Sequence, residues 1–293
     1  MATSDLLRPP PPPASEQLNL LDLPAEIRLS ILEYVFPPAT TTTTTTNLNP
    51  PIGFKTCPTT STHILNPDHP TPTQTLAPLL TCRQLHADAH LLAFTRTPFL
   101  TTSLFTATNI PTRLALLHNK QIRAIRSLTF VADARHFRKL VDWQHQPFNH
   151  PDLHLDTLTL VLHRSSFWHY LYDFTSDLVK LLRNLEGLKR LVFVRNNARV
   201  KGSFHAWYNR LVGLIMKVDH HERYIKTPCC PEKVWWSWKF DSVAQVIVLE
   251  ALPAKKWVEE EVYMGLMKPL VEELRVSVEA EEWNPDPRSR NGA

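Results

Sequence analysis

The sequence predicts an α+β protein in which an N-terminal helical module precedes a larger α/β region. Three observations support this prediction: two apolar helical patterns near the N-terminus, several strand patterns beyond residue 124, and helical patterns between those strands. The 293 residues are 43% hydrophobic and 20% charged, which is enough apolar material to bury at least one sizeable core.

The first helical pattern covers residues 18–36, with the sequence LNLLDLPAEIRLSILEYVF. Asp22 is predicted to cap the helix, Pro24 suits its first turn, and the prolines at 37 and 38 end it. Apolar residues recur at steps of three and four and form one stripe: Leu20, Leu23, Ile27, Ile31, Tyr34 and Val35.

Residues 37–75 are rich in Pro and Thr, with seven consecutive threonines at 40–46 and only two charged residues. A segment with so few large apolar side chains cannot offset its ordering entropy, so a disordered insertion is predicted. Disorder is also expected for the Pro-rich tail at 1–17 and for the tail at 284–293.

A second helix is predicted at residues 76–94. Its inner side would carry Leu79, Cys82, Leu85, Ala89 and Leu92. Because neither helix can bury its stripe alone, both are expected to pack together as one module at 18–108, split by the insertion.

The rest of the chain alternates strand and helix patterns. Strands are predicted at 125–131, 155–162, 188–194 and 244–249, and helices at 167–185, 204–224 and 256–271. Three of the strands begin about 30 residues apart, which leaves two architectures open for 109–283: an irregular leucine-rich-like solenoid or a compact α/β layer.

Two short motifs carry a family resemblance. Residues 23–35 read LPAEIRLSILEYV and residues 80–89 read LTCRQLHADA. Together they resemble the F-box, and more closely the fungal F-box-like proteins with a Leu-Pro-x-Glu-x-Arg opening and a later Thr-Cys-Arg-Gln helix. The matching positions are Leu23, Pro24, Glu26, Ile27, Arg28, Ile31, Leu32, Cys82 and Arg83. The Thr/Pro insertion departs from the F-box pattern.

F-box proteins are substrate receptors of SCF-type ubiquitin ligases. The resemblance therefore implies a non-enzymatic interaction protein without a cofactor, whose matching residues bind a Skp-family adaptor and whose region 109–283 captures an unknown protein target. The residues alone leave an alternative open. The apolar stripe of the first helix could instead close the protein's own core, giving an F-box-like scaffold without a ubiquitin-ligase role.

Composition and motifs give no support for an enzyme. The chain has 25 Pro against 6 Gly, and it lacks a P-loop, a Gly-x-Gly-x-x-Gly motif and a Gly-x-Ser-x-Gly elbow, so no catalytic residue is predicted. Two groups of metal-ligand residue types occur, and neither is predicted to bind metal. His86 and His90 lack a third ligand, and the adjacent pairs His220–His221 and Cys229–Cys230 lack a chelating spacing.

Charge is segregated along the chain. Residues 183–226 carry a local charge of +7 and residues 250–293 a local charge of −4. Aromatic residues lie near the basic stretch, at Trp207, Tyr208, Trp235, Trp236 and Trp238. Basic and aromatic residues together can bind single-stranded nucleic acid. Internal pairing of the two charged regions, together with a protein-partner surface, is favoured over that alternative.

The sequence also bears on location. It has only four cysteines, two of them adjacent, and no apolar stretch approaches the ~18 residues of a membrane span. No secretory signal pattern is seen at residues 1–13. These features predict an intracellular protein of the cytoplasm or nucleus that does not bind membranes.

Overall fold

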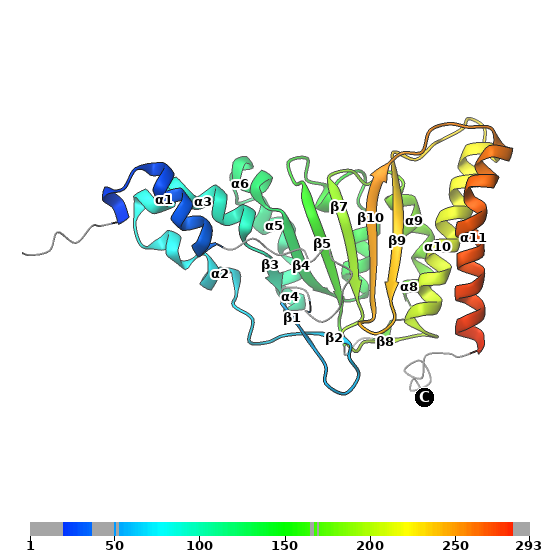
Figure 1. Ribbon diagram of the computed structural model, residues 1–293, viewed down its shortest axis with the longest axis horizontal. Coiled ribbons are helices and arrows are strands. Elements are labelled where there is room, and N and C mark those ends of the chain that lie inside the picture. Colours follow the sequence, from blue (N-terminus) through cyan, green and yellow to red (C-terminus); the bar gives the residue numbers. More distant parts are fainter. Residues whose placement is uncertain (1–19, 37–49, 51–52, 165–166, 169, 284–293) are drawn as a thin grey trace, which may run out of the picture.

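The computed structural model of the chain describes residues 20–36, 50, 53–164, 167–168 and 170–283 (Figure 1). The predictions of disorder at 1–17 and 284–293, and over 37–49, lie outside the described residues.

A six-stranded mixed sheet forms the centre of the molecule, in the order β3-β4-β5-β7-β10-β9. Four strands are parallel and lie in chain order: β3 (Phe99–Thr101), β4 (Ser127–Ala132), β5 (Leu155–Leu162) and β7 (Leu188–Val194). The hairpin of β9 (Val234–Asp241) and β10 (Val246–Pro253) then joins antiparallel to β7. Because this hairpin ends the parallel series, the chain forms a compact α/β layer, and the solenoid alternative is not seen.

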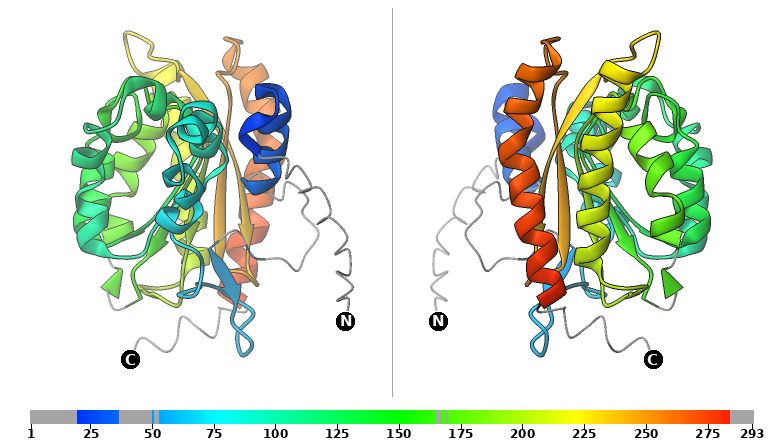
Figure 2. Two further views of the ribbon diagram at one scale, coloured as in Figure 1. Left: turned by 90° about the vertical axis from the view of Figure 1, so that its left-hand side faces the viewer. Right: turned by 90° about the vertical axis from the view of Figure 1, so that its right-hand side faces the viewer.

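The helices that follow the strands cover one face of the sheet (Figure 2). They are α5 (Ile110–Leu114), α6 (Asn119–Ala124), α7 (Ala134–Val141), α8 (Tyr170–Asp173), α9 (Thr175–Leu182) and α10 (Phe204–His220). Alternate strand residues such as Leu160, Phe193 and Ile247 point toward these helices and form the main core with Leu182 and Trp207. α4 (Leu104–Thr108) lies beside β4.

The opposite face of the sheet carries valines and is covered in part by a hairpin of β1 (Phe54–Thr56) and β2 (His63–Leu65). Phe54 is buried against this face, and the backbone N–H of Leu65 donates to Asn196 Oδ1 at 3.0 Å. The predicted disorder is therefore wrong for residues 53–75, which also hold α2 (Pro72–Thr75). The side chains of Phe54 and Leu65 suffice to order this segment because the sheet supplies the apolar surface against which they pack.

Some predicted strands and helices have the expected bounds, and others differ in bounds or type. β5 and β7 have the predicted bounds, and the strands predicted at 125–131 and 244–249 are found as β4 and β10 with shifted ends. The helix predicted at 167–185 is wrong in its first part, where β6 (Phe167–Trp168) pairs with β8 (Arg199–Val200) before α8 and α9 begin. β3 and α4 fall within the predicted module at 18–108 but belong to the sheet region.

The last helix, α11 (Glu260–Trp283), extends well beyond the predicted end at residue 271 and packs against α10. A buried ionic cluster fixes it there: Arg183 and Arg223 each donate to Asp219 Oδ1 at 3.0 Å, and the Tyr263 hydroxyl donates to Asp219 Oδ2 at 2.7 Å. Within the described part of the chain, no helix is long and apolar enough to cross a bilayer.

Candidate docking surface

The N-terminal helices form a small module with its own core. α1 (Ala25–Val35) packs against α3 (Arg83–Arg96), and short 3-10 helices precede each of them at Leu20–Asp22 and Ala77–Leu80. The module core is a separate cluster of five buried residues: Leu32, Phe36, Leu79, Ala89 and Ala93. α3 also contacts α6, which connects the module to the sheet region.

Both predicted helices are shorter than expected. Pro24, and not Asp22, occupies the N-cap position of α1. The second helix is interrupted because Cys82 is extended (φ −156°, ψ 159°) and its Sγ accepts from the Leu85 N–H at 3.4 Å, which starts α3 at Arg83. Cys82, one of the matched residues, therefore marks the start of α3 and is partly exposed there.

Arg28 is a structural residue of the module. Its side chain is buried and donates from Nε to Asp88 Oδ2 on α3 at 2.9 Å and from a terminal nitrogen to the Leu21 carbonyl at 3.2 Å. Leu32 is buried in the module core. Both were predicted to contact the adaptor, and the structure places their side chains inside the module, against Asp88 and in the module core.

The remaining side of α1 is exposed and apolar. Ile27 is 49% exposed, Ile31 38%, Val35 46% and Tyr34 89%. These four residues, spaced i, i+4, i+7 and i+8, are called the α1 stripe below, and they occupy one side of the helix. Ile27 and Ile31 thus do not close the core of this chain. The helical periodicity of the sequence also places Tyr34 and Val35 in the stripe, whereas the positions that match the F-box family do not include them.

The other matched residues flank this stripe. Leu23 is half-buried just before α1, whereas Pro24 and Glu26 are exposed at its first turn. Arg83 is exposed at the first turn of α3. Ile27 and Ile31 therefore lie in the α1 stripe, whereas Leu23, Pro24 and Glu26 lie at or just before the first turn of α1.

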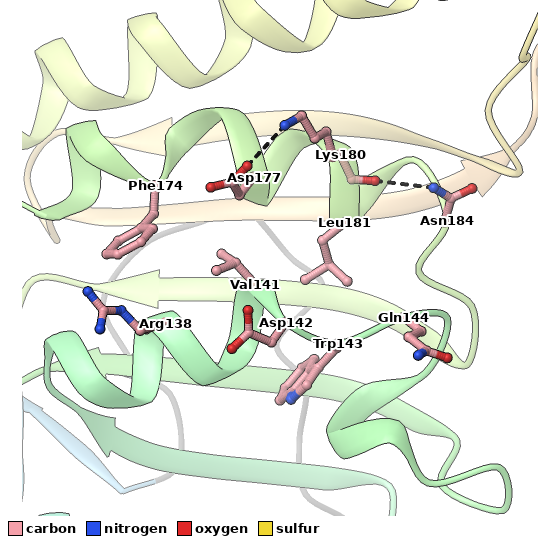
Figure 3. A pocket seen from close by; sticks show the side chains of 10 residues that line it. All are labelled: Arg138, Val141, Asp142, Trp143, Gln144, Phe174, Asp177, Lys180, Leu181 and Asn184. Carbon is pink, nitrogen blue, oxygen red and sulfur yellow. Dashed lines mark hydrogen bonds and ion pairs between the residues drawn. The ribbon is translucent and has the colours of Figure 1, made fainter.

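A groove lies elsewhere, between α7 and α9, with a volume of about 490 Å³ (Figure 3). Lys180 pairs with Asp177 across 3.1 Å, and the Arg138 guanidinium lies 5.6 Å from the centre of the Phe174 ring. Asp142 and Asn184 also line it. The groove is thus lined by side chains of both charges and by amides, with Lys180 already paired to Asp177.

The most perturbed titratable groups lie away from that groove. Burial lowers the pKa of Lys255 to about 8, and its Nζ lies 3.2 Å from the centre of the Trp235 ring. Burial, together with the neighbouring Asp219 carboxylate, raises the pKa of Glu232. The cavity beside Glu232 and Asp219 measures only about 10 Å³, the space of a single water. The perturbed groups Lys255 and Glu232 therefore do not line the groove between α7 and α9, and the cavity beside Glu232 is too small for a substrate.

One arrangement resembles a catalytic triad and was not predicted. His136 Nδ1 lies 2.6 Å from Asp133 Oδ1, and its Nε2 lies 3.0 Å from Thr108 Oγ1. However, Nε2 also faces the Leu104 carbonyl at 3.2 Å, and the Thr108 hydroxyl donates to that same carbonyl at 3.0 Å. His136 is buried, and Asp133 caps the first turn of α7. These contacts assign the group to capping and to fixing α4 on α7.

The metal-ligand residue types do not converge. His86 and His90 stack on each other on α3, with ring centres 5.2 Å apart. His220 pairs with Glu260 at 2.8 Å, and Cys229 and Cys230 are exposed. Over the described residues, no three His, Cys, Asp or Glu side chains come close enough to hold a metal ion.

Five of the ten Lys and Arg residues of the basic stretch at 183–226 form ion pairs inside the chain. Lys189 pairs with Asp156 at 2.7 Å, and Arg190 pairs with Glu250 of the acidic C-terminal region at 2.5 Å. The nearby aromatic residues Trp207, Tyr208, Trp235 and Trp236 are buried, and Trp238 packs against the main core. These rings are not available for stacking on nucleic-acid bases.

Comparison with protein-family models, with curated proteins and with solved structures found no match to this chain.

Proposed function

We propose that this chain is a non-enzymatic receptor that docks a Skp-family adaptor through the α1 stripe, in the manner of an F-box protein, and that residues 109–283 hold its protein target. The observation that carries the proposal is the exposed apolar side of α1. It begins at Ile27, within the Leu-Pro-x-Glu-x-Arg motif that resembles the F-box.

The stripe has the form of a helix that docks into an apolar groove. Anchors at i, i+4 and i+7 are typical of such contacts. Ile27, Ile31 and Val35 are each about half exposed, so complete burial by a partner would contribute roughly 1 kcal/mol per side chain. Tyr34 adds a large amphipathic side chain of the kind enriched at interface centres.

The opposite side of α1 holds the stripe in place. The Arg28–Asp88 ion pair and the burial of Leu32 fix α1 on α3 before any partner arrives. A helix ordered in advance loses less conformational entropy on binding, which strengthens binding for a given contact area. In this proposal Arg28 acts by positioning the docking helix and does not touch the adaptor.

Co-expression with a Skp-family adaptor tests the proposal. The wild type should co-purify with the adaptor, and Ile27→Asp should abolish co-purification. Leu29→Asp is the matched control because Leu29 is an exposed apolar residue of the same helix, roughly opposite the stripe. Failure of the wild type to co-purify, while a conventional F-box succeeds, would reject the ubiquitin-ligase role.

A further inference from the structure

α11 carries more apolar surface than the rest of the chain covers. The apolar side chains on its inner side are covered, because Tyr263 and Met267 are buried and Leu270 and Leu274 pack against the main core. Six large apolar side chains of the same helix are nevertheless exposed: Val262, Met264, Leu266, Val271, Val276 and Trp283. A helix with apolar residues beyond one face is expected to have more than one neighbour.

Five of the six exposed residues divide between two sides of α11. At about 100° per residue, Val262, Leu266 and Val276 fall within roughly 80° of one another, and we call them the outer stripe. Met264 and Val271 lie on the other side of the buried face. Gly265 borders the outer stripe, and a Cβ placed there would have no contact within 4 Å, so this side is open to approach.

Charge around the outer stripe is strongly negative. α11 carries seven glutamates against Lys268 and Arg275, a net charge of −5. Arg275 is already engaged, since its Nε donates to Glu272 at 3.0 Å and it also pairs with Glu279. Glu261 and Glu273, beside and within the stripe, have no ion-pair partner among the described residues.

We propose that the outer stripe of α11 docks an amphipathic helix of another protein, whose apolar face is bordered by Lys or Arg. A second copy of this chain fits poorly, because two helices of charge −5 would repel each other. The chain's own residues 284–293, NPDPRSRNGA, contain no large apolar side chain that could cover the stripe.

The position of α11 makes this surface separate from the first. α1 lies at one end of the sheet and α11 at the other (Figure 1). An adaptor on α1 and a basic helix on α11 would therefore not compete. The inference goes beyond adaptor docking and does not depend on it, since a loss of adaptor binding leaves the α11 surface intact.

Two 18-residue peptide probes test the proposal by fluorescence anisotropy on the full chain: an amphipathic Leu/Lys helix and its Leu/Glu counterpart. The Leu/Lys probe should bind the wild type with an affinity that falls as the salt concentration rises, and the Leu/Glu probe should not bind. The double variant Leu266→Ser with Val276→Ser should weaken binding more than about tenfold.

The matched control is Met264→Ser with Val271→Ser, which removes the same kind of exposed apolar surface from the other side of α11. It should change affinity less than about twofold, with thermal unfolding confirming that both double variants are folded. Equal losses in the two double variants, or equal binding of both probes, would overturn the proposal. A concentration-dependent dimer that disappears in the outer-stripe variant would instead identify a second copy as the occupant and reject the basic partner.

Discussion

The Ile27→Asp substitution tests whether Ile27 is an exposed interface residue or a core residue. Its effect on the free energy of unfolding follows from the structure. Ile27 is 49% exposed, so folding shields only about half of a side chain whose full burial is worth about 1.5–3 kcal/mol. The shielded half contributes about 1 kcal/mol. Residue 27 is also the third residue of α1, where a carboxylate gains about 0.3–1 kcal/mol from the helix N-terminus.

The two effects largely cancel, so the free energy of unfolding should fall by about 0.5 kcal/mol or less. For a domain of this size such a change lowers Tm by about 2 °C at most. Leu32→Ala is the contrast, because Leu32 is buried in the module core and its truncation should cost about 2–5 kcal/mol.

Circular dichroism melting and hydrogen exchange of peptides covering residues 25–35 measure these effects. Exchange reports α1 directly, even where the module opens without the sheet. Slow exchange in Ile27→Asp and fast exchange in Leu32→Ala are expected. If Ile27→Asp melted as early as Leu32→Ala and exchanged as fast, the stripe would be a core element and the docking proposal would lose its basis.

Three further predictions concern the supports of the fold. Arg28→Ala should cost about 3–5 kcal/mol and speed hydrogen exchange in α3, since it leaves the Asp88 carboxylate without its buried partner; unchanged exchange would refute the positioning role. Phe54→Ala should lower stability by about 3–5 kcal/mol in urea unfolding because Phe54 is buried against the valine face of the sheet, and a neutral result would mean that the β1–β2 hairpin is dispensable. Burial opposes ionisation of Asp133, but hydrogen bonds from Arg135 and His136 outweigh it and lower the pKa of Asp133 to about 2, below the unfolded value of about 3.9. The wild type should therefore lose stability as the pH falls from about 4 to 2, and Asp133→Asn should lose less stability over that range.

Local patterns predicted the centre of the sheet well. β5 and β7 each end in a mainly apolar run that is buried on both faces, at 158–162 and 191–194, and such runs are recognisable without knowledge of their neighbours. β9 was missed because its sequence, VWWSWKFD, was interpreted as aromatic residues beside a basic stretch. Its burial depends on pairing with β10 and on packing against α9 and α10.

The insertion illustrates a second limit. Residues 53–65 contain few apolar side chains, and their order comes from the valine face formed by strands more than 60 residues away, including Val131 and Val194. Backbone contacts add to it, since the His63 N–H donates to the Ala244 carbonyl at 3.1 Å. Composition is a local property and does not show such a distant surface.

For the candidate site, the helical period identified the α1 stripe, but the motif match did not separate exposed from buried positions. Arg28 and Ile27 are adjacent in the motif, yet one is buried against Asp88 and the other faces outward. The distinction depends on where α3 packs. The outer stripe of α11 was not predicted because the expected helix ended at residue 271, before Val276, and the segment was described by its negative charge alone.

Titration of purified wild-type chain with a purified Skp-family adaptor tests the central claim most directly. Calorimetry should show saturable one-to-one binding that Ile27→Asp abolishes and Leu29→Asp retains within about twofold, because only the first residue lies in the α1 stripe. Absence of binding by the folded wild type, under conditions where a conventional F-box binds the same adaptor, would contradict the account.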